Sequence, residues 1–216
     1  MLGWLVDPLN TVLFHLANDA VTWAELLGFV SGGACVWLTV RRHVLNFPTG
    51  IANSAIFLVL FTSARLWADA ALQIMFIALG FAGWWQWARS RGGQPEIRVR
   101  RARSVELAAC VAFVVGATAM LTYVLRQADD TAPFWDALTT ALSIAAQWLL
   151  NNRRLETWFF WIAADCIYIP LYIVKKLDLT AGVYVLFLGL CVAGFRSWQA
   201  ARAAEAEVPD RVPVSA

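Results

Sequence analysis

Long apolar stretches separated by short polar segments make up most of this chain. Seven stretches of about 20 residues are mainly apolar, and a helix of this length crosses a ~30 Å hydrocarbon core. The predicted spans are 23–40, 45–64, 69–88, 105–125, 134–150, 158–174 and 179–198. The pattern therefore predicts an all-α polytopic membrane protein with seven transmembrane helices.

Polar segments account for the rest of the chain. Residues 1–21 are apolar but repeatedly interrupted, and Asp7-Pro8 is a good helix start, so we expect an interfacial amphipathic helix there. Residues 91–104, with Gly92-Gly93 and Pro95, predict a cytoplasmic loop. Residues 201–216 predict a disordered cytoplasmic tail.

Composition agrees with a membrane protein and excludes several other classes. The chain is 60% hydrophobic and 15% charged with a mean hydropathy of +0.61, whereas soluble domains have about 25% charged residues. No basic run interleaved with aromatics indicates nucleic-acid binding. The four cysteines stand singly in apolar stretches and are interpreted as small buried side chains, with no disulfide, metal site or cofactor expected. An enzyme is not expected either, because Asp165 is the only catalytic candidate at membrane depth.

Basic residues are distributed unequally between the two ends of the predicted spans. Of 17 Lys and Arg residues, the side opposite the N-terminus holds all but four. The four exceptions are Arg65, Arg126, Lys175 and Lys176. The positive-inside rule then places the N-terminus outside and the C-terminus in the cytoplasm.

The second half of the chain repeats the first at an offset of 111 residues without a gap. Identical pairs include Trp37 and Trp148, Arg42 and Arg153, Gly83 and Gly194, and Trp87 and Trp198. The repeat predicts two three-helix units of the same orientation, 22–90 and 127–200, joined by a linker helix over 105–126. This parallel 3+1+3 arrangement is that of SWEET-type transporters, which bind substrates near mid-membrane between the repeats.

One helical face of the sixth span carries Trp158, Trp161, Asp165, Tyr168 and Tyr172. A carboxylate inside a membrane helix costs about 3 kcal/mol on insertion scales, so it is expected beside water, a partner or a ligand. Two interpretations are open. The aromatic residues could be packing or interface anchors with the acid bonded to a neighbouring helix, or the face could be a stacking and hydrogen-bonding wall for a polar aromatic ligand.

The two halves differ where this face lies. At four equivalent positions the second half has a polar or larger aromatic residue: Phe47 and Trp158, Gly50 and Trp161, Ser54 and Asp165, Phe57 and Tyr168. An asymmetric ligand would require such a difference, whereas a symmetrical scaffold would not. A cationic ring with hydroxyl groups suits this face, because a cation over an indole gains about 0.5–2 kcal/mol.

Five further polar side chains at membrane depth are candidates for the same cavity. They are Asn46, Asn53, Gln73, Gln147 and Asn151. Each could instead make interhelical hydrogen bonds worth about 0.6–2 kcal/mol.

Two other groups are expected to have structural roles. Arg65 and Asp69 are four residues apart and predict an ion pair at the outer surface. The tryptophans of GWWQW, Trp84, Trp85 and Trp87, are interpreted as interface anchors.

The chain also resembles a known family in several motifs. They are NFPTGI, LWADAALQ, GWWQW, RRLETWFFWIAADCIYIPLYIVKKL and LTAGVYVLFLGLCVAGFRSW. Over residues 22–200 these closely resemble the PnuC family of nicotinamide riboside transporters.

This resemblance implies a fold, a location and a mechanism. It implies a SWEET-like homotrimer in the bacterial inner membrane that takes up nicotinamide riboside by facilitated diffusion and alternating access. A cytoplasmic nicotinamide riboside kinase would then trap the vitamin by phosphorylation. Carried over by position, the residues around the ligand would be Trp158, Trp161, Asp165, Gln73, Asn46 and Gln147.

Three alternatives stay open from the sequence. Similar proteins carry thiamine or riboflavin, and thiamine also has a cationic ring. A SWEET-type sugar transporter would fit the fold but explains the aromatic wall less well. A purely structural membrane subunit would leave the gain of Asp165 in the second half unexplained.

Overall fold

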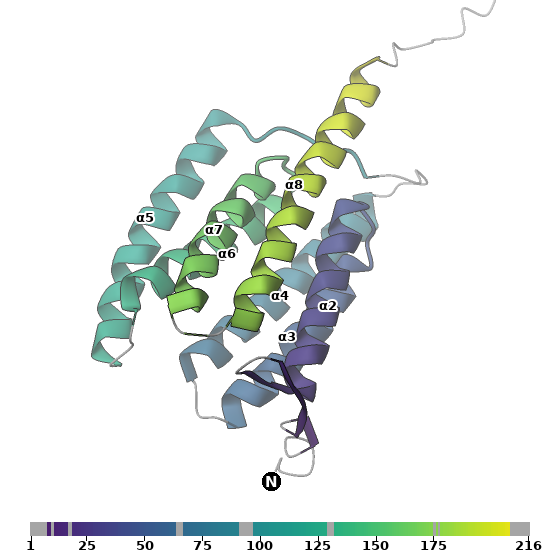
Figure 1. The fold of residues 1–216 in the computed structure, drawn as a ribbon. Coiled ribbons are helices and arrows are strands. Elements are labelled where there is room, and N and C mark those ends of the chain that lie inside the picture. Colours follow the sequence, from purple (N-terminus) through teal and green to yellow (C-terminus); the bar gives the residue numbers. More distant parts are fainter. Residues whose placement is uncertain are drawn as a thin grey trace, which may run out of the picture.

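Seven long helices follow a short β-hairpin in the computed structural model of this chain (Figure 1). The structure describes residues 8–9, 11–16, 19–63, 67–90, 97–128, 132–174, 176 and 178–207. The strands are β1 (Val12–Leu16) and β2 (Asp19–Thr22). The helices are α2 (Trp23–Val40), α3 (Asn46–Ser63), α4 (Trp67–Ser90), α5 (Ser104–Gln127), α6 (Pro133–Asn151), α7 (Thr157–Val174) and α8 (Asp178–Glu207).

Each predicted span has its helix, with ends within two residues of the prediction apart from the end of α8. That helix continues to Glu207, so the prediction that disorder begins at 201 is wrong for 201–207, and 208–216 lie outside the described residues. By length and composition, α2, α5, α7 and residues 179–205 of α8 are apolar enough to cross a membrane. The other three long helices all contribute side chains to the polar cavity described below.

The amphipathic helix predicted over 1–21 is wrong for 12–16 and 19–21, which form strands, whereas the described residues 8–9 are helical. β1 and β2 pair as an antiparallel hairpin, with Val12 opposite Thr22. Thr22 then begins α2 with a capping box, because its side chain accepts from the Glu25 N–H at 3.3 Å and the Glu25 carboxylate accepts from the Thr22 N–H at 2.9 Å. This reciprocal cap fixes the start of the first long helix and separates it from the hairpin.

The helices form two groups of three and one peripheral helix. In the first group α3 packs against α2 and α4, and in the second α7 packs against α6 and α8. The groups meet through contacts of α2 with α8 and of α4 with α6. α5 packs mainly against α6 and lies at one edge of the bundle (Figure 1).

The turns that end α2 and α6 have the same geometry. Arg42 and Arg153 have φ angles of 53° and 58°, and their N–H groups donate to the carbonyls of Thr39 and Leu150 at 2.9 and 2.8 Å. The following residue in each turn donates to the carbonyl five residues earlier at 2.9 Å. Both are Schellman motifs with arginine at the position that usually holds glycine. The equivalent pair of the sequence repeat thus adopts one backbone conformation.

Two buried tryptophans join the two groups of helices. Trp87 of α4 and Trp198 of α8 are both 0% exposed. The Trp87 indole donates to the carbonyls of Leu150 and Asn151 at 3.3 and 3.1 Å, and the Trp198 indole donates to Thr39 at 3.0 Å. Each third helix therefore bonds the end of the first helix in the opposite group. The interpretation of Trp87 as an interface anchor is wrong, while Trp84 and Trp85 of the same motif are exposed.

Close helix contacts surround these indoles. Phe47 packs edge-on against Trp87 with ring centroids 5.0 Å apart, and Trp158 packs edge-on against Trp198 at 5.5 Å. Gly83 and Gly194 allow this approach, because an added Cβ would lie 2.3 Å from the Phe47 ring and 2.3 Å from the Trp158 ring, respectively. No larger residue fits at either glycine without displacing an aromatic ring.

The described part of the predicted 91–104 loop is ordered against this end of the bundle. Ile97 and Val99 are buried in the core around Trp87 and Trp198. The Arg100 N–H donates to the Arg153 carbonyl at 3.0 Å. The loop thus covers the arginine-rich end of the helices.

Candidate functional site

A cavity of about 370 Å³ lies between the two groups of helices. Its walls come from α2, α3 and α4 on one side and from α6, α7 and α8 on the other. No residue of α5 is among the described residues that line it. This volume is in the range of pockets that bind small organic molecules.

Both halves contribute to the cavity from the same repeat positions. Each lining residue from α6, α7 and α8 has a counterpart 111 positions earlier that also lines the cavity. Examples are Ser54 with Asp165 and Phe57 with Tyr168. Positions 111 residues apart in the sequence therefore line the cavity from both groups of helices.

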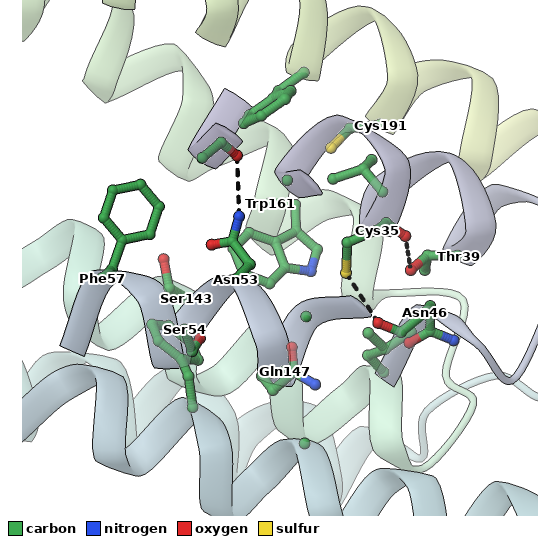
Figure 2. A pocket seen from close by; sticks show the side chains of 18 of the residues that line it. Cys35, Thr39, Asn46, Asn53, Ser54, Phe57, Ser143, Gln147, Trp161 and Cys191 are labelled. Carbon is green, nitrogen blue, oxygen red and sulfur yellow. Dashed lines mark hydrogen bonds between the residues drawn. The ribbon is translucent and has the colours of Figure 1, made fainter. Parts of the chain in front are cut away.

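The chemistry of paired positions is unequal. Seven pairs place a polar or larger side chain in the second half: Gly32 and Ser143, Val36 and Gln147, Phe47 and Trp158, Gly50 and Trp161, Ser54 and Asp165, Phe57 and Tyr168, Gly80 and Cys191. At these seven pairs the first half leaves more space, and the second half supplies larger aromatic faces or additional hydrogen-bonding groups. Figure 2 shows Trp161 near the middle of the view, with Ser54 and Ser143 on one side of it and Cys35 on the other.

Eight of the nine predicted site residues line the cavity. They are Trp158, Trp161, Asp165, Tyr168, Gln73, Gln147, Asn46 and Asn53. Asn151 is not among the lining residues. It is 3% exposed, its amide nitrogen donates to the Leu79 carbonyl at 2.8 Å, and its oxygen accepts from Gln147 at 3.1 Å. The predicted ion pair of Arg65 and Asp69 lies outside the described residues and side chains.

Asp165 brings the only formal charge to the cavity among its described lining residues. It is 4% exposed, and its Oδ2 has no hydrogen-bond partner within the described part of the chain. Cys191 of α8 also lines the cavity. No lysine, arginine or histidine is among the described lining residues. A buried carboxylate with a free oxygen favours a ligand that carries positive charge or hydroxyl groups.

The two tryptophans of α7 have different surroundings. Trp158 is 1% exposed because its ring is wedged against Trp198 and Gly194, yet its Nε1 is buried without a partner in the described residues. Trp161, one turn further along, is only half-buried and reaches the cavity. Trp161 therefore offers a face for stacking, and Trp158 offers one donor.

Two predicted amides already have protein partners. The Asn46 amide donates to the His43 carbonyl at 2.8 Å. The Asn53 amide donates to the Gly28 carbonyl at 2.9 Å and to the Ser31 hydroxyl at 2.7 Å. The Asn53 amide uses both of its donors to bind α3 to α2, whereas Asn46 uses one donor in the turn before α3.

Three tyrosines of α7 and α8 form a stacked cluster beside the cavity. Tyr184 lies 4.7 Å from Tyr168 and 5.2 Å from Tyr172 between ring centroids. Tyr168 and Tyr184 both line the cavity, and Tyr184 is not among the site residues predicted from the sequence. The 111-residue offset could have identified Tyr184, because Tyr184 is the counterpart of the predicted site residue Gln73. The same offset leads from Gly80 to Cys191.

Comparison with known proteins identifies the family. Residues 22–200 match a family model described as nicotinamide mononucleotide transporter. The chain belongs to this family. The resemblance found in the sequence motifs is therefore confirmed, and the protein is a multi-pass membrane transporter.

Individual relatives differ in the ligand that their names give. The chain is 26% identical over 220 residues to the nicotinamide riboside transporter PnuC of Escherichia coli, covering 88% of this chain and 92% of the relative. It is also 26% identical over 196 residues to the riboflavin/roseoflavin transporter RibM of Streptomyces davaonensis, covering 88% and 91%. A crystal structure of the vitamin B3 transporter PnuC superposes with a TM-score of 0.69 at 22% identity, covering 84% of this chain and 83% of that one. The structural likeness shows that the fold is shared.

Proposed function

We propose that this protein carries nicotinamide riboside across the bacterial inner membrane. The observation that carries the proposal is the carboxylate of Asp165, the one charged group among the described lining residues. Its Oδ2 has no hydrogen-bond partner in the described part of the chain, and the half-buried indole of Trp161 lines the same cavity. Nicotinamide riboside has a cationic pyridinium ring and a ribose. An indole face attracts the ring, and a carboxylate accepts from ribose hydroxyls while balancing the charge.

The cavity favours the riboside over the mononucleotide. A phosphate adds about two negative charges, and its binding sites in proteins are built from Arg, Lys or backbone N–H groups. The described lining residues include no basic side chain and include one carboxylate. We therefore expect phosphorylation of the ligand to abolish binding, so a phosphorylated product inside the cell would not return.

Riboflavin and thiamine are the second candidates. One relative is named as a riboflavin/roseoflavin transporter, and thiamine carries a cationic ring as nicotinamide riboside does. Riboflavin is neutral, so it would leave the Asp165 charge unbalanced in the cavity. Thiamine is cationic, so the electrostatic argument does not separate it from nicotinamide riboside. A sugar substrate, as in SWEET-type transporters, would not explain the aromatic face of the second half.

The proposed architecture is 3+1+3, with repeats 22–90 and 127–200 in parallel and α5 as the linker. The matching turns at Arg42 and Arg153 and the reciprocal bonds of Trp87 and Trp198 support it. Transport would be facilitated diffusion, with rocking of one repeat on the other opening the cavity to alternate sides. The arginine-rich ends would face the cytoplasm, with the N-terminus outside. A homotrimer and trapping by a nicotinamide riboside kinase complete the proposal by analogy with the family.

The first experiment titrates the detergent-solubilised protein in parallel with four ligands. Nicotinamide riboside, its 5′-phosphate, thiamine and riboflavin are compared by calorimetry and by intrinsic tryptophan fluorescence. Saturable binding of the riboside alone would support the proposal. Binding of thiamine or riboflavin instead would assign another vitamin to the same site, and tight binding of the mononucleotide would contradict the electrostatic argument.

A further inference from the structure

Asn151 of α6 lies behind the cavity-lining residue Gln147 and ties it to α4 of the other helix group. The Asn151 amide nitrogen donates to the Leu79 carbonyl of α4 at 2.8 Å, and its Oδ1 accepts from the Gln147 amide nitrogen at 3.1 Å. The backbone carbonyl of Asn151 accepts from the Trp87 indole at 3.1 Å. Gly83 of α4 leaves the necessary space, because an added Cβ there would overlap the Asn151 amide. Asn151 is therefore held from α4 through both its side chain and its backbone.

These bonds determine which way round both amides lie. A backbone carbonyl only accepts, so the end of Asn151 that meets Leu79 must be its NH2 group. The other end of Asn151 is then an oxygen, which accepts only from the nitrogen of Gln147. The bond to Asn151 leaves Oε1 as the end of the Gln147 amide that can meet a ligand in the cavity. Figure 2 shows this oxygen on the side of Gln147 that faces Trp161.

The first half of the molecule has no such pair of amides. The counterparts of Gln147 and Asn151 are Val36 and Val40, which pack against the buried core. The same place in the repeat is therefore filled by apolar side chains where no amide is needed. Buried amides are costly unless they are hydrogen-bonded, so the linked pair in the second half indicates a role beyond packing.

We propose that Asn151 is a positioning residue that fixes the Gln147 amide with Oε1 toward the cavity, so that the site selects a ligand ring carrying a hydrogen-bond donor. In nicotinamide riboside that donor is the carboxamide NH2 group. A glutamine free to turn could offer either end of its amide and would bind a carboxamide and a ketone alike. This inference rests on the proposed function, because it takes nicotinamide riboside as the ligand.

The binding test compares nicotinamide riboside with acetylpyridine riboside. The second compound keeps the cationic ring, the carbonyl group and the ribose, and replaces the NH2 group by a methyl group. The charge facing Asp165 is thus the same in both ligands, and only the donor differs. Calorimetry gives the two dissociation constants and their ratio. In wild type we expect acetylpyridine riboside to bind at least about fivefold more weakly, because it leaves Gln147 Oε1 unpaired.

Two variants release the Gln147 amide. Asn151→Leu keeps the approximate size of the side chain, and Asn151→Val introduces the residue found at the equivalent position 40. Both should bring the ratio of dissociation constants to within about twofold of one, because Gln147 can then turn its NH2 group toward the ketone. Leu79 lies inside α4, so its carbonyl keeps its helical bond when Asn151 is replaced. Thermal unfolding of each variant shows whether it is folded.

Two further variants show whether Asn151 acts through Gln147. Gln147→Leu should bring the ratio near one by itself, and adding Asn151→Leu to it should not change the ratio further. Asn152→Leu is the matched control, because the neighbouring Asn152 amide donates to the Trp148 carbonyl at 2.8 Å and is not among the lining residues. Its ratio should stay within about twofold of the wild-type value.

The outcomes separate this inference from the proposed function. If wild type binds both ribosides equally well, selection of a donor is overturned while the proposed function stands. If Gln147→Leu removes the preference and the two Asn151 variants keep it, Gln147 reads the ligand unaided and the positioning role of Asn151 is overturned. If wild type binds neither riboside, the proposed function fails and this inference fails with it.

Discussion

At the scale of single residues, the hydrogen-bonding groups and ring faces that are not occupied by described protein contacts decide which ligand the cavity can bind. Asn46 and Asn53 use their amide nitrogens to bond backbone carbonyls, so they act first as parts of the scaffold. Asp165 keeps an oxygen free, and Trp161 keeps part of its indole uncovered. Both residues belong to α7, so this helix carries much of the chemistry that could recognise a ligand.

Asp165→Asn is expected to weaken nicotinamide riboside binding by about tenfold or more. The change keeps the shape of the side chain but removes the charge that balances the pyridinium, and hydrogen bonds to charged groups are worth about 1.5–3 kcal/mol. Calorimetry on the purified variant measures the loss. The unfolding temperature should not fall, because removing a buried charge relieves a desolvation cost.

Ser54→Ala is the matched control for that variant. Ser54 occupies the equivalent position in the first half and lines the same cavity. Removal of its hydroxyl should weaken binding less than Asp165→Asn does, since a neutral hydrogen bond contributes about 0.5–1.5 kcal/mol, which is about two- to tenfold in affinity, against about 1.5–3 kcal/mol for a charged one. Unchanged binding in Asp165→Asn, or an equal loss in both variants, would remove Asp165 from the ligand site.

At the scale of elements, apolar length predicted all seven helices, because a membrane span must satisfy its backbone internally. Apolar length gave the wrong prediction for two segments whose secondary structure does not depend on apolar length. Residues 201–207 continue α8 because alanine, arginine and glutamate are strong helix formers even without an apolar face. The hairpin over 12–22 was missed because strand pairing depends on a partner segment, which a helix-start signal at Asp7-Pro8 does not reveal.

Sequence patterns also predicted one part of the candidate site and missed another. Helical spacing grouped Trp158, Trp161, Asp165 and Tyr168 on one face of α7, and all four line the cavity. Spacing did not show that Asn53 is bonded to a carbonyl 25 residues earlier, because that contact depends on how α3 packs against α2. No local sequence pattern identifies Tyr184 as a site residue, whereas the 111-residue repeat offset does.

Gly194→Ala is expected to destabilise the protein by about 1–3 kcal/mol, the usual cost of overpacking a filled core. The added Cβ would lie 2.3 Å from the Trp158 ring and push α8 away from α7. Thermal unfolding in detergent, followed by tryptophan fluorescence, measures the change.

Gly189→Ala is the control on the same helix, because nothing lies within 4 Å of an added Cβ there. It should be neutral or slightly stabilising, since alanine favours helix over glycine, and equal losses in both variants would contradict the packing argument.

At the scale of the whole molecule, the two halves are joined at the arginine-rich end by reciprocal bonds. Thr39 and Leu150 are equivalent positions that line the cavity, and their carbonyls accept from the indoles of Trp198 and Trp87. The two indoles lie beyond the Phe47 and Trp158 rings, with centroids 6.2 Å apart. These bonds hold each third helix to the end of the first helix in the opposite group at this edge of the cavity, so we expect rocking of one group on the other to break them.

Trp87→Phe and Trp198→Phe should therefore each favour the conformation that is open at the arginine-rich end. Phenylalanine keeps an aromatic ring but removes the N–H donor, and a lost hydrogen bond of about 0.5–1.5 kcal/mol shifts a two-state equilibrium about two- to tenfold. The native thiols Cys35 and Cys191 line the cavity and report its access. In oriented vesicles, a membrane-impermeant maleimide applied to the arginine-rich side should label them faster in both variants than in wild type, and more slowly from the opposite side.

Trp85→Phe is the control, because Trp85 is 59% exposed on the same helix as Trp87. Because the two bonds occupy equivalent places, the two variants should change labelling by similar factors. A change in one alone would show that the halves do not open together.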